Sequence, residues 1–346
     1  MSPEALTPLT RERMTALLSG MATRRVVVVG DVMLDRYLIG DTDRLSPEAP
    51  VPVVTVRTTR SALGGAANVA ANVAALGATG LLTGAVGDDE HAAAIRAELA
   101  AHRLDDRYLV PVAGRPTTTK TRVIARGQQV VRIDEERDDP LDSNDLARLW
   151  ATIEAMLASA DALVLEDYNK GTLGPALIRD AVAAARRRGM PVVVDPKYRH
   201  FFEYRGATVF KPNRRELEAA LGAGVDISRD PLALIQARER LAVDNLLVTL
   251  GAEGMALVTH DGRRVQVPSR AREVYDVSGA GDTVTAWVAT ALAAGASVSE
   301  AAFLANYAAG LEVAKAGVAT VAPAEVLAAF DEEHDAIGRW RRGGVI

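Results

Sequence analysis

Four short runs of β-branched and aliphatic residues dominate the hydrophobic pattern of the chain. They are RRVVVVGD at 24–31, ALVLED at 162–167, PVVVDP at 191–196 and NLLVTLG at 245–251. Apolar runs without polar alternation are typical of strands that are covered on both faces, as in a parallel sheet. We therefore expect these four segments to be buried strands of a parallel sheet.

Stretches with helical periodicity lie among these strands, at 145–158 and 175–189, and the chain is predicted to be helical from residue 280 onward. Strand and helix in alternation predict right-handed βαβ units, which give a mostly parallel central sheet with helices on both faces. Residues 1–22 are predicted to form a helical extension, and residues 23–346 a single α/β domain.

Two segments interrupt this rhythm, because their strand-like residues alternate with polar ones, at 51–56 and 117–134. The sequence Arg126-Gly127-Gln128 is typical of a hairpin turn inside the second segment. Alternating strands need cover on one face only. We therefore predict a small antiparallel β lid at one edge of the main sheet, with strands from about 36–62 and 107–134.

Composition excludes several classes of function. The 346 residues have a formal net charge of -5 and 4% aromatic residues, which argues against nucleic acid as a partner. The N-terminus lacks a continuous apolar segment and no run of 18 apolar residues occurs, so we expect neither a secretion signal nor a membrane partner. The absence of cysteine excludes disulfides and cysteine-bound zinc, and it leads us to expect a cytoplasmic protein.

The most informative motif is DVSGAGDTVTAW at 276–287. Its small residues precede an apolar pattern with helical spacing, which indicates a loop that leads into a helix. Gly279, Ala280 and Gly281 leave the backbone N–H groups of this helix start open to an anion. Asp282 follows at the position where such an anion would be transferred. The alternative is that Asp282 caps the helix, and spacing alone does not decide between the two.

A second glycine motif, GGAANVAANVAALG at 64–77, places Asn68 and Asn72 on one helical face. Asparagine is mediocre inside helices, so two of them suggest a hydrogen-bonding role, whereas the alternative is a packing helix with asparagines at the solvent. Asp31 and Asp35 follow the end of the first strand, where open α/β sheets bind ligands, although loop carboxylates are often only solvated. The single glycine of GDVMLD excludes the dinucleotide fingerprint.

Two weaker motifs follow later strands. In KPNRRE at 211–216, Asn213 and Glu216 have the spacing of a helix capping box. VTLGAEG at 248–254 ends a strand in a loop with two glycines, which is either an ordinary turn or a phosphate contact. Lysine is rare, with five among the 40 lysine and arginine residues. The compact charge of a lysine suits a phosphate, so lysines beside the motifs suggest phosphate binding. The alternative is that their positions beside the motifs are a coincidence. The lysines beside motifs are Lys120, Lys170, Lys197 and Lys211.

Together these motifs resemble the ribokinase-like, PfkB-type carbohydrate kinases over nearly the whole chain, from Val26 to about Val321. Both glycine motifs of that family occur in the expected order. The resemblance implies a ribokinase-like α/β fold and transfer of a phosphoryl group from ATP to a sugar hydroxyl, with Mg²⁺. It implies that Asp282 is the catalytic base and that the three small residues before it form the anion hole.

The resemblance also assigns roles to residues of the other motifs. The ATP-binding residues that it implies are Asn213, Glu216, Thr249, Gly251, Gly254 and Asn306. The substrate-binding residues are expected to be Asp31, Asp35, Gly64, Gly65, Asn68, Asp167, Lys170 and Lys197. Mg²⁺ is expected at Asn213 and Glu216, and a monovalent cation such as K⁺ at Asp276 and Ser278.

Within the family, residues 30–54 look like the D-glycero-β-D-manno-heptose 7-phosphate kinases, and EDYNKG at 166–171 and DPK at 195–197 are similar to them too. This likeness implies that ATP phosphorylates the C1 hydroxyl of that sugar phosphate, on the way to the ADP-heptose of lipopolysaccharide core. A kinase of another sugar phosphate and a non-catalytic sugar- or nucleotide-binding protein remain alternatives. The exposed lid edge favours a homodimer through the lids.

Overall fold

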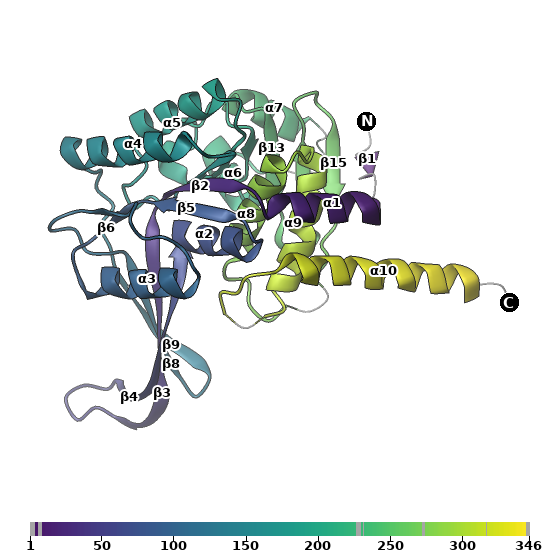
Figure 1. The fold of residues 1–346 in the computed structure, drawn as a ribbon. Coiled ribbons are helices and arrows are strands. Elements are labelled where there is room, and N and C mark those ends of the chain that lie inside the picture. The colour runs from purple at the N-terminus through teal and green to yellow at the C-terminus, as the bar shows by residue number, and fades with distance from the viewer. Residues whose placement is uncertain are drawn as a thin grey trace.

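The computed structural model describes residues 4–5, 9–225, 230, 232–271, 274–315 and 317–343. The strands of its main sheet are β1 (Glu4–Ala5), β2 (Arg25–Gly30), β5 (Thr79–Thr83), β10 (Ala162–Glu166), β11 (Val192–Asp195), β12 (Val209–Phe210), β13 (Asn245–Thr249), β14 (Met255–Val258) and β15 (Arg264–Val267). Their order is β1-β15-β14-β13-β12-β11-β10-β2-β5 (Figure 1). Pairing is parallel except that β14 lies antiparallel to β13 and β15. All four predicted strands are confirmed.

The apolar runs form central strands because successive side chains of a strand point to opposite faces of the sheet. In β2, Val26 and Val28 pack into the hydrophobic core on one face, whereas Val27 and Val29 pack into the core on the other. Strands β10 and β11 alternate in the same way. A strand that serves two cores cannot tolerate polar residues at every second position, which explains the uninterrupted runs.

Helices cover both faces of the main sheet. They are α1 (Arg11–Met21), α2 (Ala66–Ala75), α3 (Glu90–Ala101), α4 (Ser143–Leu157), α5 (Pro175–Arg187), α6 (Arg214–Leu221), α7 (Ala233–Leu241), α8 (Ala280–Ala293), α9 (Val298–Glu312) and α10 (Pro323–Gly343), with short 3₁₀ helices at Tyr198–His200 and Gly251–Glu253. Helices α1, α2, α3, α8, α9 and α10 pack on one core, and α4, α5, α6 and α7 on the other. The predicted α/β fold with helices on both faces is confirmed (Figure 1).

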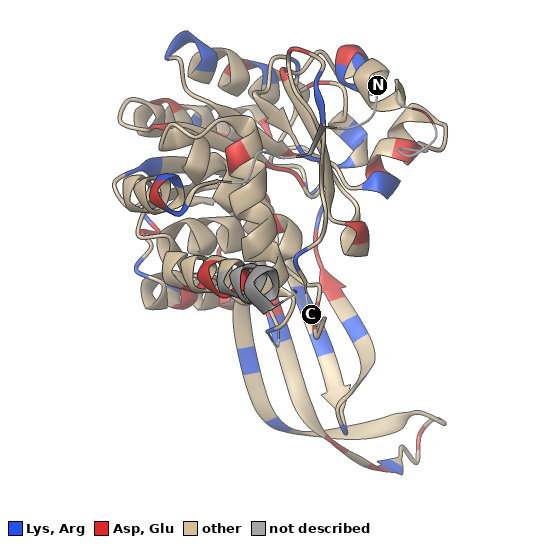
Figure 2. Cartoon of the chain, turned by 90° about the vertical axis from the view of Figure 1, so that its right-hand side faces the viewer, with Lys and Arg blue, Asp and Glu red and all other residues tan. Residues whose placement is uncertain are grey.

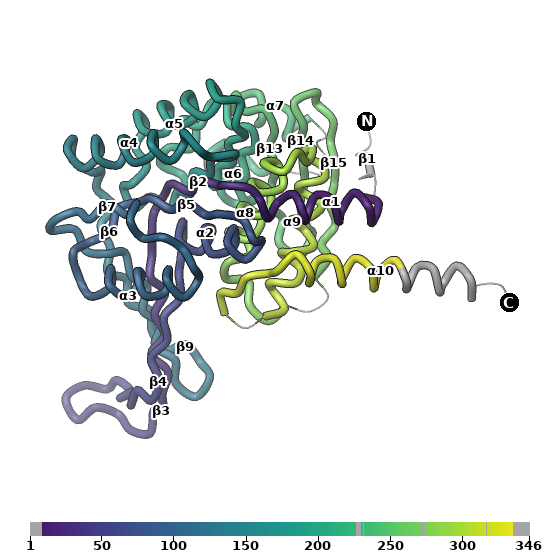
Figure 3. Tube along the Cα trace, in the orientation of Figure 1, coloured from purple at the N-terminus to yellow at the C-terminus, as the bar shows by residue number. Residues whose placement is uncertain are grey.

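The helix predicted within residues 1–22 is α1, and it begins after Thr10, whose hydroxyl accepts the N–H of Arg13. The prediction was wrong for Glu4 and Ala5, which form strand β1 and pair with β15 at the edge of the main sheet. Arg11 of α1 forms an ion pair with Asp331 of α10 at 2.7 Å. Helices α1 and α10 therefore contact each other although they are far apart in the sequence (Figure 3). Among the described residues, no helix is both long enough and apolar enough to cross a bilayer.

A second sheet, the lid, projects from the body of the molecule (Figures 1 and 2). Its strands are β3 (Val32–Leu45), β4 (Pro52–Gly65), β8 (Thr119–Ala125) and β9 (Gln128–Glu135), in the order β4-β3-β8-β9. The predicted hairpin turn between β8 and β9 is present, with Arg126 and Gly127 at φ 51° and 77°, as a two-residue turn of this hand requires. The two outer strand pairs are antiparallel, as predicted.

The lid differs from the prediction in two respects. Its central pair, β3 with β8, is parallel, because the chain passes through the body of the molecule before it returns to the lid. The second lid segment begins at Thr119 instead of near residue 107. The residues before it include β7 (Val110–Pro111), which pairs with β6 (Ala85–Val86) in a separate small sheet.

Candidate active site

Asp282 lies in the first turn of α8 and is 5% exposed. Gly279 starts this helix in the left-handed conformation, φ 95°, which glycine adopts without strain, and no side chain caps the helix. Other elements hold both oxygens of Asp282. Asn68 Nδ2 donates to Oδ2 at 2.7 Å, and the Tyr168 hydroxyl donates to Oδ1 at 2.9 Å. The helix-cap alternative for Asp282 is therefore wrong.

Helix α2 contributes buried amides to this arrangement. Asn72 Nδ2 donates to the backbone oxygen of Asn68 at 3.0 Å, and Asn72 Oδ1 accepts the hydroxyl of Thr283 at 3.1 Å. Asn68 and Asn72 are only 2% and 0% exposed, so the alternative of asparagines at the solvent is wrong. The two glycine motifs of the sequence are thus joined through hydrogen bonds between α2 and α8.

Burial is the main reason why the pKa of Asp282 is raised from its ordinary value to about 6. The neighbouring carboxylate of Asp195 raises this pKa further, whereas the hydrogen bonds from Asn68 and Tyr168 lower it. A pKa of about 6 leaves Asp282 mostly ionised at pH 7. A pKa so near to neutral pH suits a group that accepts a proton.

A cavity of about 370 Å³ opens beside the start of α8, where Ala280 and Gly281 line it. Five of the six residues predicted to bind ATP line the same cavity, namely Asn213, Thr249, Gly251, Gly254 and Asn306. Its other walls are largely apolar and include Met255 and Val284. Such walls suit a flat ring such as adenine, and free N–H groups at a helix start suit a phosphate.

Glu216, the sixth residue predicted to bind ATP, is not among the residues that line this cavity. Its Oε2 accepts the N–H of Asn213 at 2.8 Å, while Asn213 Oδ1 accepts the N–H of Glu216 at 2.9 Å. Lys197 Nζ donates to Glu216 Oε1 at 2.6 Å. The capping box predicted from KPNRRE is therefore confirmed, and it leaves Asn213 facing the cavity.

Several residues predicted to bind the sugar meet where the lid joins α2. Asp35 of β3 accepts a hydrogen bond from Arg122 of β8. A Cβ atom at Gly64 would lie only 2.6 Å from Asp35 Oδ2, and Gly65, which starts α2, has φ 56°. Glycine is required at both positions, since a side chain at the first would collide with Asp35 and one at the second would strain the backbone.

Asp31 and Asp167 order the loop that follows β10. Asp31 Oδ2 accepts the backbone N–H groups of Tyr168 at 2.7 Å and Lys170 at 2.9 Å. Asp167 Oδ2 accepts the hydroxyl of Tyr204 at 2.8 Å. Both aspartates are 1% exposed, so the solvated-carboxylate alternative for Asp31 is wrong. A direct contact of either residue with a sugar stays a prediction.

Lys170 and Lys197 have different partners. Lys170 Nζ lies 2.8 Å from Glu136 Oε1, and Lys120 Nζ lies 3.3 Å from the other oxygen of the same carboxylate. Lys197 instead pairs with Glu216 in the capping box of α6. The structure therefore places Lys170 at the base of the lid and Lys197 beside α6. Binding of a sugar phosphate stays a prediction for both.

Asp276 and Ser278, the predicted monovalent-cation site, lie in the loop before α8. Asp276 Oδ1 accepts the N–H of Ser278 at 2.9 Å, and the N–H of Asp276 donates to the backbone oxygen of Val313 at 3.2 Å. Glu312, at the end of α9, is 0% exposed, and burial raises its pKa to about 8, with Asp276 adding to the shift. Ion binding at this loop stays a prediction.

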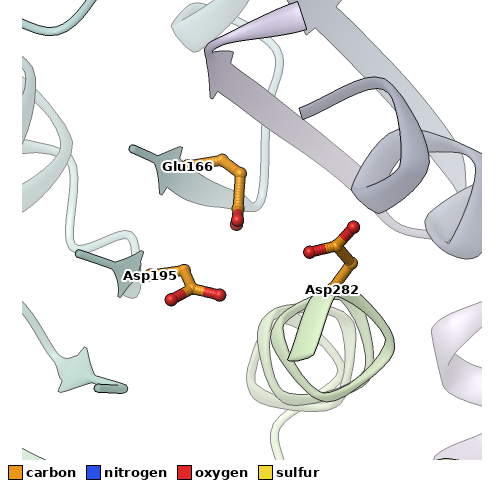
Figure 4. A group of neighbouring side chains, drawn as sticks. All are labelled: Glu166, Asp195 and Asp282. Atoms are coloured by element: carbon orange, nitrogen blue, oxygen red, sulfur yellow. The ribbon is translucent and has the colours of Figure 1, made fainter. Parts of the chain in front are cut away.

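Four side chains of the site were not among the predicted site residues: Glu166, Asp195 and Lys211, which are buried, and Tyr168, which is partly buried. The carboxylates of Glu166, Asp195 and Asp282 face one another, with one oxygen of each within 4.8 Å of the others (Figure 4). Lys211 Nζ donates to Asp195 Oδ2 at 2.8 Å. The available signal is that EDYNKG, DPK and KPN each coincide with the carboxyl end of a neighbouring parallel strand, which is where ligands bind.

Comparison with known proteins agrees with this geometry. The family model described as pfkB family carbohydrate kinase matches residues 23–325. The bifunctional protein HldE of Azorhizobium caulinodans is 48% identical over 307 residues, which are 88% of this chain and 64% of that protein. HldE of Caulobacter vibrioides is also 48% identical, over 310 residues, 89% of this chain and 63% of that protein. The chain thus spans somewhat less than two thirds of the length of these relatives.

Solved structures share the fold. The structure of Arabidopsis thaliana ribokinase complexed with ribose and ATP has a TM-score of 0.71 at 23% identity, covering 89% of this chain and 98% of that one. Phosphofructokinase-2 from Escherichia coli in complex with fructose-6-phosphate has a TM-score of 0.69 at 17% identity, covering 90% and 98%. This likeness confirms the predicted ribokinase-like fold. Since the family model also matches most of its length, the chain belongs to the pfkB family of carbohydrate kinases.

Proposed function

We propose that this protein transfers the terminal phosphoryl group of ATP to the C1 hydroxyl of D-glycero-β-D-manno-heptose 7-phosphate. The product is the 1,7-bisphosphate, a precursor of the ADP-heptose of lipopolysaccharide core. The observation that carries the transfer is the buried Asp282, oriented by Asn68 and Tyr168 in the first turn of a helix that also lines the cavity. The sugar is inferred from the resemblance of residues 30–54 to heptose 7-phosphate kinases and from the relatives named HldE.

In this proposal, Asp282 accepts the proton of the sugar hydroxyl while that oxygen forms a bond to the terminal phosphorus of ATP. The bond from this phosphorus to the bridging oxygen breaks, and ADP leaves with the electron pair. The backbone N–H groups at Gly279, Ala280 and Gly281 stabilise the transferred group. Donors that are already in place at a helix start lower the barrier, because charge on the phosphoryl oxygens meets them without rearrangement.

The residues that line the cavity would bind the nucleotide, with adenine on its apolar walls. Asn213 and Glu216 would hold the Mg²⁺ that accompanies ATP and neutralises phosphate charge. Both side chains already bond to each other's backbone, and Glu216 also binds Lys197. Each side-chain oxygen of Asn213 and Glu216 keeps a second lone pair. These two residues therefore fit a Mg²⁺ ion that they contact through bound water molecules. A K⁺ ion at Asp276 and Ser278 is part of the same proposal.

On the sugar side, Asp35, Gly64, Gly65 and Asn68 would contact hydroxyl groups, while Asp31 and Asp167 support the loop that carries Lys170. Lys120 and Lys170 both converge on Glu136. A phosphate dianion offers the same kind of acceptor as a carboxylate with more charge, so it can replace Glu136 as their partner. For Lys197, the pairing with Glu216 favours the nucleotide side instead.

We further propose that the lid closes over the sugar and that lids of two copies pair in a cytoplasmic homodimer. The outer strand β9 is exposed along its whole length, and its Val131 and Ile133 are 47% and 49% exposed. An exposed apolar edge strand invites pairing with another strand. Light scattering should show a dimer that the double variant Val131→Asp/Ile133→Asp converts to monomers. A monomeric wild-type protein would contradict this part of the proposal.

The decisive experiment is phosphorylation of a panel of sugars by the purified chain with ATP and Mg²⁺. The panel contains the heptose 7-phosphate, the unphosphorylated heptose, fructose 1-phosphate and tagatose 6-phosphate, and phosphorus NMR locates the new phosphate. We expect kcat/KM for the heptose 7-phosphate to exceed the others by at least about 100-fold, since buried charged groups reject ligands that leave them unpaired. Preference for another sugar phosphate would contradict the substrate, and no turnover with any member would support a non-catalytic binding protein.

A further inference from the structure

Arg115, which lies between β7 and β8, is a buried cation without a close carboxylate partner. It is 8% exposed, and over the described residues its one carboxylate partner is Asp139, whose Oδ2 lies 3.9 Å from Nη1. A buried guanidinium has lost its water, which costs free energy unless other groups replace that water. Burial lowers the pKa of Arg115 from its ordinary value for the same reason. Other contacts must therefore hold this side chain in the protein.

Three backbone carbonyl groups supply these contacts. Arg115 Nη2 donates to the oxygens of Arg137 at 3.1 Å and Asp139 at 3.0 Å, and also to the oxygen of Lys170. The first two belong to the exit segment of the lid, residues 136–139, by which the chain leaves β9. The third belongs to the β10 loop, which follows β10 and ends near residue 172. One guanidinium thus joins the exit segment to the β10 loop.

The exit segment and the β10 loop also touch through their backbones. A Cβ atom at Gly171 would lie 2.1 Å from the backbone oxygen of Asp139 and 2.8 Å from Arg115 Nη2. Glycine is required there, and its φ of 84° favours glycine as well. Asp31 accepts N–H groups of the same loop, whereas Arg115 donates to one of its carbonyl oxygens. The loop is therefore fixed through both kinds of backbone group.

The β10 loop carries two side chains of the proposed site. The Tyr168 hydroxyl donates to Asp282 Oδ1 at 2.9 Å, and Lys170 Nζ lies 2.8 Å from Glu136 Oε1 in the exit segment. Lys170 is thus bound to the exit segment through its side chain and, by way of Arg115, through its backbone. A phosphate that replaces Glu136 as the partner of Lys170 removes the first connection. The bond from Arg115 then remains as the connection between lid and loop.

We propose that Arg115 is a positioning residue that couples the lid to the catalytic base. It fixes the β10 loop relative to the exit segment, so that Tyr168 orients Asp282 and Lys170 reaches the sugar phosphate when the lid covers the sugar. Lysine cannot take this role, because its compact ammonium lacks the planar fork that reaches several carbonyl groups. The inference rests on the proposed function, since it takes Asp282 as the base and the lid as the cover of the sugar.

The first test is the kinetics of Arg115→Gln. We expect kcat/KM for the sugar phosphate to fall by about tenfold to a hundredfold, because small displacements of positioned groups are costly, while KM for ATP stays within about twofold. The hydrogen bond from Tyr168 lowers the pKa of Asp282. A displaced Tyr168 should therefore move the acid limb of the pH profile to higher pH, by about one unit or less. A merely structural role of Arg115 would leave this limb in place.

The other groups that act on the pKa of Asp282 are separate from Arg115. Besides burial, they include Asn68, Asp195 and Lys211. In the part of the chain that the structure describes, no hydrogen bond or ion pair joins any of these three residues to Arg115. A shift of the acid limb in Arg115→Gln is therefore expected to pass through Tyr168.

A double variant tests that route. If Arg115 acts through Tyr168, the acid limb of Arg115→Gln/Tyr168→Phe should coincide with that of Tyr168→Phe alone. Additive shifts would overturn the proposal, and so would an unmoved limb in a folded Arg115→Gln variant. The matched control is Arg148→Gln, which changes an exposed arginine that donates to the backbone oxygen of Pro111 in β7 at 3.1 Å. This control should leave both KM values and the acid limb unchanged.

Hydrogen exchange provides a test without any substrate. Arg115→Lys keeps the positive charge, and it decides the outcome where Arg115→Gln fails to fold. Residues 136–139 and 167–172 should exchange faster together in this variant, while β11 stays unchanged. Unchanged exchange in either segment would overturn the proposal. Because no sugar enters this experiment, the turnover panel alone decides whether the proposed function fails, and the exchange result decides whether Arg115 joins lid and loop.

Discussion

The two sides of Asp282, which we propose bind the nucleotide and the sugar, are built in different ways. On the nucleotide side, uncharged residues line an open cavity of about 370 Å³. On the sugar side, charged side chains already satisfy one another, as Asp35 does with Arg122, and Lys120 and Lys170 with Glu136. An uncharged cavity accepts a ring without breaking contacts, whereas a sugar phosphate has to replace ion pairs of the protein. In the proposed function, the nucleotide site is therefore preformed, whereas the sugar site is completed by its substrate.

The elements that carry each side explain this difference. The nucleotide cavity is built on β13, α8 and α9, whose side chains belong to the two buried cores. The sugar side includes lid strands, and β9 at the lid's edge is exposed over its whole length. Well-packed elements hold a shape without a ligand, while elements with few buried contacts are free to rearrange around one. Variants on each side should therefore fail in different ways.

The largest effect is expected at Asp282, where the two sides meet. Asp282→Asn keeps the shape of the side chain but cannot accept the proton, so kcat should fall by about 10²–10⁴-fold or more. The nucleotide cavity stays intact, so calorimetry should show ATP affinity close to that of the wild-type protein. A wild-type kcat in this variant would show that Asp282 is not the catalytic base. A loss of ATP affinity would show that the nucleotide side and the sugar side do not act separately.

Substitution of Lys170 and of Lys197 should raise KM for different substrates. Lys170→Ala should raise KM for the sugar phosphate by about tenfold to a hundredfold, because charge-assisted contacts to phosphate are among the strongest hydrogen bonds. KM for ATP should hardly change, and an unphosphorylated heptose should not distinguish this variant from the wild type. Lys197→Ala should instead raise KM for ATP, since Lys197 binds Glu216. Equal increases of KM for the sugar phosphate in both variants would contradict the division into a nucleotide side and a sugar side.

The pH dependence of kcat/KM tests how the neighbours of Asp282 set the pKa of this proposed base. A protonated Asp282 cannot accept a proton, so kcat/KM should fall about tenfold per pH unit below pH 6 and level off above it. The hydrogen bond from Tyr168 lowers the pKa of Asp282, so Tyr168→Phe should move this limb to higher pH. A loss of rate without a shift of the limb would show that Tyr168 has only a structural role.

The smallest expected effect concerns the lid itself. Residues 51–56 and 117–134 should become more protected from hydrogen exchange when sugar phosphate binds, because closure orders their backbone. ATP alone should leave their exchange nearly unchanged, since its cavity lies in the body of the molecule. Strands β10 and β11 serve as the internal reference. Unchanged exchange at saturating sugar phosphate would show that the lid is a static sheet.

Much of the fold could be predicted from the sequence because its signals are local. The runs at 24–31 and 162–167 are strands that serve two cores, so their composition alone reveals burial on both faces. The turn at Arg126 and Gly127 was predicted from neighbouring residues as well. The parallel pairing of β3 with β8 could not be predicted, because it depends on where a distant crossover returns the chain.

The sequence by itself determined which loops carry the chemistry, since the motifs with Asp282, Asn68 and Asn213 all lie at strand ends or helix starts. Only the tertiary structure decided what each side chain does. In the folded chain Lys197 forms an ion pair with Glu216, and Glu166 lies beside Asp195 and Asp282 (Figure 4). Such partnerships join residues far apart in the chain, and burial and charge at that meeting point depend on packing, which no local pattern encodes.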